Sequence, residues 1–203
     1  MINDFNVPVT YFGGTGGHFL ISFLNAAYLN DHTIFKYSIF GNAHNTGFAN
    51  VVGGGLGSDA PLNNDKIKIL LSNLNYRKFI GVHITEYNLL LDFFTKIIKI
   101  TYQHSDIAEI SKVFAFKWDS NYPIDHGMLI LDTTERAKRL LDCFSDKNEE
   151  GVICVSWVEL YKEEPRLLIE KLSKLFVIPI QNFNVSNLLE WRKITNNVLV
   201  LHP

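Results

Sequence analysis

The chain has 203 residues, of which 47% are hydrophobic and 20% are charged, and its formal net charge is −2. This composition predicts one folded domain with a large core rather than a disordered chain. The balance of charge argues against a nucleic-acid-binding protein that relies on a general basic surface. Two widely separated cysteines, no signal peptide and no long apolar span lead us to expect a cytoplasmic protein without a membrane span.

The stretch Val9–Leu29 has the pattern of a strand, a glycine-rich turn and a helix. An apolar run with β-branched residues predicts a buried strand, and an apolar helix is expected to begin at about His18. Four glycines lie between them: Gly13, Gly14, Gly16 and Gly17. Glycines let the backbone approach an anion, and a helix N-terminus attracts one. The pattern therefore predicts a phosphate-binding loop over Gly13–His18, and the alternative is a tight turn that binds nothing.

The loop differs from two standard phosphate-binding motifs. The triphosphatase motif G-x-x-x-x-G-K-[ST] needs a lysine, and the first lysine of this chain is Lys36. The dinucleotide motif G-x-G-x-x-G would use Gly14 and Gly16, but its third glycine falls at Phe19. We therefore expect a phosphate-binding loop of neither kind.

The next segment is less regular. Thr33–Phe40 is a candidate strand, and residues 41–65 form a Gly- and Asn-rich excursion from the domain. A loop of that length suggests either a lid that binds an acceptor or a surface loop without a function. A short helix is expected over Asp65–Asn75, which places apolar residues on one face.

The remaining chain alternates strands with helices. Strands are expected at Lys78–Ile84, Lys96–Tyr102, Gly127–Asp132 and Gly151–Trp157. Helical segments are expected at Thr85–Phe94, Ser105–Phe116 with Ser105 as the cap, Thr134–Phe144 after an Asp132–Glu135 capping box, Pro165–Phe176 and Leu188–Ile194. This alternation predicts an α/β fold with three α/β/α layers around a mostly parallel sheet.

Three polar candidates follow predicted strands of this sheet. They are the Gly13–His18 loop, His83 and the segment Tyr102–Ser105. Ligands of open parallel sheets bind beyond the carboxyl ends of the strands, so the three are expected at one edge. A histidine there has the pKa range of a general base, and the alternative is a hydrogen-bonded core histidine. The histidines show no metal-ligand spacing, so no metal site is expected.

Three segments together resemble the sulfotransferase family. Arg77–Phe114 is similar to the family's strand with a Thr-His pair, its following strand and its serine-bearing helix. Cys154–Ile178 is similar to the late strand, turn and proline-initiated helix, and Thr15–Leu20 to the end of the phosphosulfate loop. The resemblance covers roughly residues 7–30 and 77–178, with the segments in the family's order.

The resemblance implies a P-loop NTPase-like fold that binds 3′-phosphoadenosine 5′-phosphosulfate (PAPS) and transfers sulfonate to a hydroxyl or amine. The residues that match the loop for the 5′-phosphosulfate are Thr15, Gly16, Gly17 and His18. His83 matches the catalytic base, and Ser111 lies near the serine that binds the 3′-phosphate. The acceptor would be a small molecule or a glycan.

The sequence departs from the family at its cationic positions. The family's two lysines and its 3′-phosphate arginine are replaced by Gly14, Gly81 and Tyr102. Ser111 lies five residues after Asp106, where four is usual in the family. Candidates for the missing positive charge are His18, His104 and Arg192. The lost cations favour a second hypothesis, a non-catalytic nucleotide- or glycan-binding relative. A third, a nucleotide kinase-like enzyme, lacks the motif lysine and acidic residues placed for Mg²⁺.

Overall fold

A computed structural model gives the arrangement of residues 5–34, 51–52, 78–82, 88–117 and 125–201. Its centre is a parallel sheet whose strands lie in the order β2-β3-β1-β4-β5. The strands are β1 (Val7–Thr10), β2 (Val51–Val52), β3 (Phe79–Val82), β4 (Ile97–Thr101) and β5 (Val152–Ser156). The prediction of an α/β fold with a parallel sheet is confirmed.

The strands all run parallel, so their carboxyl ends lie at the same end of the sheet. Val9 of β1 lies opposite Gly81 of β3 on one side and Ile98 of β4 on the other. All residues of β1, β3 and β4 are buried. Continuous apolar, β-branched runs of this kind form strands that are covered on both faces.

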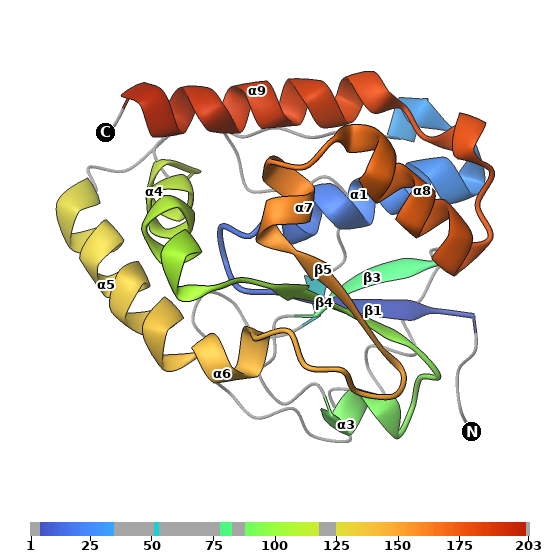
Figure 1. Ribbon diagram of the computed structural model, residues 1–203, viewed down its shortest axis with the longest axis horizontal. Coiled ribbons are helices and arrows are strands. Elements are labelled where there is room, and N and C mark those ends of the chain that lie inside the picture. The colour runs from blue at the N-terminus through green and yellow to red at the C-terminus, as the bar shows by residue number, and fades with distance from the viewer. Residues whose placement is uncertain (1–4, 35–50, 53–77, 83–87, 118–124, 202–203) are drawn as a thin grey trace.

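Helices cover both faces of the sheet (Figure 1). One face carries α1 (Gly17–Leu29), α7 (Trp157–Tyr161), α8 (Pro165–Phe176) and α9 (Val185–Leu201), and the other carries α3 (Asn88–Leu91) and α6 (Leu141–Phe144). The helices α4 (Ile107–Lys117) and α5 (His126–Arg139) pack together beyond the carboxyl end of β4. Three short 3₁₀ helices complete the described elements: η1 (His32–Ile34), η3 (His104–Asp106) and η4 (Ile180–Asn182).

The core is divided by the sheet. Ile98 and Ile100 of β4 belong to the larger apolar cluster, on the face that α1 covers. Ile97 belongs to a smaller cluster with Leu90 and Phe94, next to α3. This division follows from the period of two in a strand, which sends successive side chains to opposite faces. The three layers predicted from the sequence are therefore present.

The predicted strand Gly127–Asp132 is wrong, because these residues form the first turns of α5. The carboxylate of Asp125 accepts a hydrogen bond from the Met128 amide at 3.1 Å and caps the helix. The predicted helix start after an Asp132–Glu135 capping box is wrong for the same reason. A short apolar run does not distinguish a strand from a helix, and the cap lies upstream of it.

Other boundaries shift by smaller amounts. The helix expected from Ser105 begins instead with η3 at His104 and continues as α4 from Ile107. Gln103 caps η3, and its amide donates to the Asp106 carboxylate at 2.8 Å. The short helix expected at Leu188–Ile194 is the middle of the longer α9. Thr33 lies in η1 and Val51–Val52 form β2, while the rest of the excursion at 41–65 and nearly all of the strand and helix expected beside it lie outside the described residues.

Candidate functional site

The glycine loop connects the carboxyl end of β1 to the first turn of α1. Gly14 and Gly16 have φ angles of 85° and 84°, in the left-handed region that favours glycine. Gly16 is the N-cap of α1, and no side chain caps the N-terminus of this helix. The turn therefore needs glycine at these two positions for its backbone conformation.

Other helices pack closely on the loop, which is a second reason for its glycines. A Cβ atom at Gly14 would lie 2.6 Å from the carbonyl oxygen of Ile110 in α4. A Cβ atom at Gly16 would lie 2.8 Å from the indole of Trp191 in α9. The loop is thus covered by α4 and α9. No local pattern predicts these contacts, because each residue looks like an ordinary core position of its own helix.

Thr15 and His18 are both turned into the protein. The Thr15 hydroxyl is fully buried and donates to the carbonyl of Phe12 at 2.6 Å, which closes the turn. His18 is buried in the first turn of α1, and its ring meets the Tyr11 ring edge-on at a centroid distance of 5.4 Å. Burial raises the pKa of Tyr11 well above its ordinary value. The loop therefore offers mainly backbone groups to a ligand.

Ser111 lies on α4, directly after the residue whose carbonyl contacts Gly14. Its side chain is fully buried, and its hydroxyl makes no hydrogen bond within the described part of the chain. The helix α4 packs against α5, where Thr133 and Ala137 are the buried residues. Ser111 therefore lies next to a residue that packs on the glycine loop, but its own side chain is buried.

The ends of β3 and β1 lie side by side, because Val82 is opposite Thr10. His83, the proposed base, follows Val82 and lies outside the described residues. On the other side of β1, Tyr102 is buried after β4, and its hydroxyl donates to the carbonyl of Ala137 in α5 at 2.9 Å. His104 is exposed in η3. Tyr102 thus helps to hold α5 in place. The strands β3 and β4 pair with β1 on its two sides, so their carboxyl ends flank the start of the loop.

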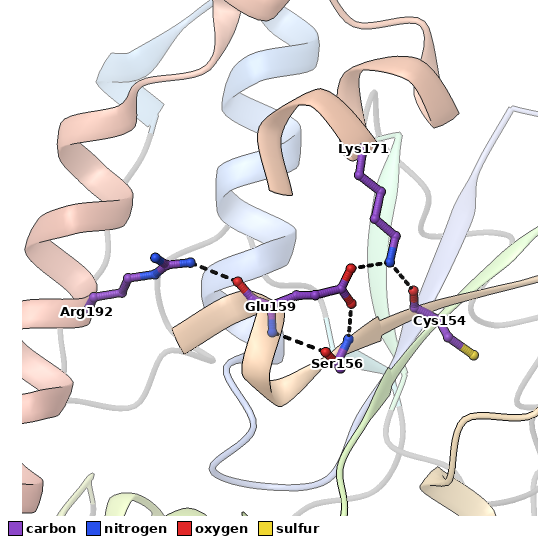
Figure 2. Close-up of polar contacts among 5 residues, drawn as sticks. All are labelled: Cys154, Ser156, Glu159, Lys171 and Arg192. Atoms are coloured by element: carbon purple, nitrogen blue, oxygen red, sulfur yellow. Dashed lines mark hydrogen bonds and ion pairs between the residues drawn. The ribbon is translucent and has the colours of Figure 1, made fainter. Parts of the chain in front are cut away.

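Arg192 of α9 is buried and binds the end of α7 (Figure 2). Its Nε donates to the Leu160 carbonyl at 2.7 Å, its Nη2 to the Glu159 carbonyl at 2.8 Å, and its Nη1 to the Glu163 carbonyl. These contacts satisfy carbonyl groups that a helix leaves unpaired at its C-terminus. Burial lowers the pKa of the guanidinium group. In this structure the charge of Arg192 is directed to α7 rather than to the glycine loop.

The structure therefore assembles only part of the predicted site. Gly13, Gly14, Gly16 and Gly17 form one turn with Thr15 and His18, and Ser111 lies in the helix that packs on that turn. The described residues hold no group of three or more His, Cys, Asp or Glu side chains able to bind a metal ion. What the arrangement provides is a backbone loop at a helix N-terminus, which suits an anionic group.

Comparison with known proteins identifies no relative: no protein-family model, no curated protein and no solved structure matches the chain. Within the described ranges, no helix has the length and apolar character needed to cross a membrane.

Proposed function

We propose that this chain binds the phosphate groups of a nucleotide through the Gly13–His18 loop. The observation that carries the proposal is the course of this loop. It leaves a central parallel strand, turns through two glycines in the left-handed region and enters α1, whose N-terminus no side chain caps. The first turn of a helix presents backbone N–H groups and the positive end of the helix dipole, a combination that binds phosphate.

The strand order supports a ligand at this place. After β1, the chain forms β2 and β3, which lie on one side of β1. It then crosses to the other side of β1 and forms β4 and β5. The carboxyl ends of the adjacent strands β1 and β4 are thus the point where the order reverses. In open α/β sheets, ligands bind in the crevice outside the strands at such a point. The glycine loop begins there.

The finer form of the proposal is sulfonate transfer from PAPS to a hydroxyl or amine of a small molecule or glycan. It rests on the resemblance to sulfotransferases, whose segments fall on β3, β4 and α4 and on β5, α7 and α8. His83 would take the acceptor's proton, and the loop N–H groups would stabilise charge on the leaving phosphate. Ser111 would bind the 3′-phosphate after a rearrangement that uncovers its hydroxyl.

One observation favours a second candidate, a nucleotide-binding protein without catalysis. Two of the side chains considered at the family's cationic sites are engaged elsewhere, since Arg192 binds α7 and Tyr102 binds α5. Gly81 is buried within β3. A donor with several negative charges would then be held mainly by backbone groups. Such a site can bind a phosphate, but it lacks the charge-assisted hydrogen bonds of lysine and arginine, which are about twice as strong as neutral ones.

The test is calorimetric titration with adenosine 3′,5′-bisphosphate. ATP and GTP, whose phosphates are arranged differently, are titrated separately as controls. Micromolar binding of the bisphosphate alone would support the PAPS donor. Binding of ATP or GTP instead would support a phosphate site with another ligand, and absence of all binding would contradict the proposal. Gly16→Ala is expected to weaken binding, because a Cβ atom at this position strains the loop backbone at a φ of 84° and meets the Trp191 indole. Gly151→Ala, at a φ of 78° just before β5, is the matched control for backbone strain away from the loop.

Catalysis has a separate test. If the bisphosphate binds, His83→Ala is expected to abolish sulfonate transfer while leaving bisphosphate binding unchanged, because a base acts on the acceptor rather than on the donor's phosphates. Transfer at the wild-type rate in this variant would remove His83 from the mechanism. Failure of wild-type protein to transfer sulfonate despite tight binding would favour the non-catalytic candidate.

A further inference from the structure

The strand β5 is the outermost strand at one side of the described sheet. It pairs with β4 on one side, and no other described strand pairs with it on the other side. The carbonyl of Gly151, just before the strand, accepts from the Ile97 amide at 2.9 Å. Because backbone groups alternate along a strand, Val152, Cys154 and Ser156 direct theirs away from β4. A second strand could pair with these groups.

Three of the outward groups are instead bound within the chain, two of them by charged side chains (Figure 2). The Lys171 ammonium donates to the Cys154 carbonyl at 2.9 Å, and the Ser156 amide donates to the Glu159 carboxylate at 2.6 Å. The Val152 amide donates to the carbonyl of Glu149 at 3.1 Å. Two charged side chains thus occupy the backbone positions that a pairing strand would need.

Lys171 and Glu159 also bind each other, so they form one closure rather than two contacts. Their charged groups form an ion pair, and their side chains are 34% and 18% exposed. Glu159 is fixed further by the capping box, in which its amide donates to the Ser156 hydroxyl at 3.1 Å. Arg192 holds the Glu159 carbonyl from α9. The closure is therefore anchored in three helices.

The sequence of β5 makes a free edge hazardous for this chain. Its residues, Val-Ile-Cys-Val-Ser, carry no charge and no proline, and three are β-branched. Short segments with high β-propensity and low charge pair with identical segments when their edge is exposed. Natural proteins protect such edges with charged side chains, lysine above all. The partner that this edge fits best is thus another copy of itself.

We propose that Lys171 and Glu159 close the edge of β5 against a second copy of this chain. When the closure is removed, β5 pairs with β5 of another molecule. An antiparallel pairing of identical strands is related by a two-fold axis, so the product is a closed dimer. The two copies of β5 then form hydrogen bonds to each other through the backbone groups that Lys171 and Glu159 otherwise bind.

The experiment compares Lys171→Met with Lys174→Met. Both remove one positive charge from α8, but Lys174 is exposed and lies in the last turn of the helix. Sedimentation over a range of concentrations is expected to show self-association of Lys171→Met at least about tenfold tighter than that of wild type, which is about 1.4 kcal/mol. Lys174→Met is expected to behave as wild type. Equal association of all three proteins would overturn the proposal.

Two further variants separate an opened edge from general loss of stability. Glu159→Gln keeps an acceptor for the Ser156 amide but breaks the ion pair, and it replaces Lys171→Met if that variant does not fold. Leu168→Ala removes a buried side chain of the same helix and leaves Lys171 and Glu159 in place. In the opened variants, exchange of the Cys154 amide hydrogen should slow as concentration rises. Self-association of Leu168→Ala to the same extent, or unchanged exchange in the associated form, would refute pairing through β5.

Discussion

The side-chain amide of Asn25 pairs with the backbone of Phe79. Its Nδ2 donates to the Phe79 carbonyl at 2.8 Å, and its Oδ1 accepts from the Phe79 amide at 3.0 Å. Asn25 is fully buried in the helix that follows the glycine loop, and Phe79 begins the strand that leads to His83. This contact therefore fixes two parts of the candidate site relative to each other.

We expect Asn25→Leu to lower the free energy of unfolding by about 3 kcal/mol, because it leaves a buried amide and carbonyl without their partner. Asn182→Ala is the matched control, since Asn182 makes a single, partly buried bond to the Ala27 carbonyl at 3.2 Å. Its expected cost is about 1 kcal/mol. Urea denaturation measures both, and equal effects of the two substitutions would contradict a special role for the Asn25 pair.

Val177 is expected to be a site of stabilising substitution. It ends α8 with a φ of 55°, in the left-handed region, and its side chain is 89% exposed. A β-branched residue is strained there, whereas glycine is not. Val177→Gly should raise the free energy of unfolding by about 1 kcal/mol. Val177→Ala keeps the Cβ atom and should gain less, so a larger gain for alanine in urea denaturation would disprove the explanation.

Stability is expected to fall in alkaline solution because of buried tyrosines. Burial, with a smaller contribution from Cys143, raises the pKa of Tyr102, and burial raises that of Tyr11. The neutral hydroxyls are thus favoured by the folded state. Their contribution is complete below the pKa of an unfolded tyrosine, about 10, and is lost as the pH rises through the folded values.

The measurement is urea denaturation from pH 7 to pH 11 on wild type and Tyr102→Phe. The variant should lose about 1 kcal/mol at pH 7, where the hydrogen bond to Ala137 is missing. Above pH 10 its stability should fall less steeply than that of wild type, because one of the two titrating hydroxyls is absent. Parallel pH profiles would show that Tyr102 does not carry the effect.

Local chemistry determined the elements that the sequence alone identified. The strands β1, β3, β4 and β5 follow from apolar, β-branched runs, and α8 begins at Pro165 as expected for a residue with a fixed φ and no N–H group. The glycine turn after β1 is local as well, because its two positive φ angles suit glycine. Where an apolar run was short, as at Gly127–Asp132, the pattern alone could not separate strand from helix, and a cap three residues before the first apolar side chain decided it.

What surrounds the glycine turn was decided only by the tertiary structure. Trp191 and Arg192 are neighbours on α9, yet one covers Gly16 and the other binds the end of α7, some thirty residues away in sequence. No local pattern contains such pairings, because they depend on which helix faces which once the apolar surfaces are buried. The sequence by itself thus determined the turn and the strand that leads to it. The packing of α4, α7 and α9 determined how much of that turn a ligand can reach.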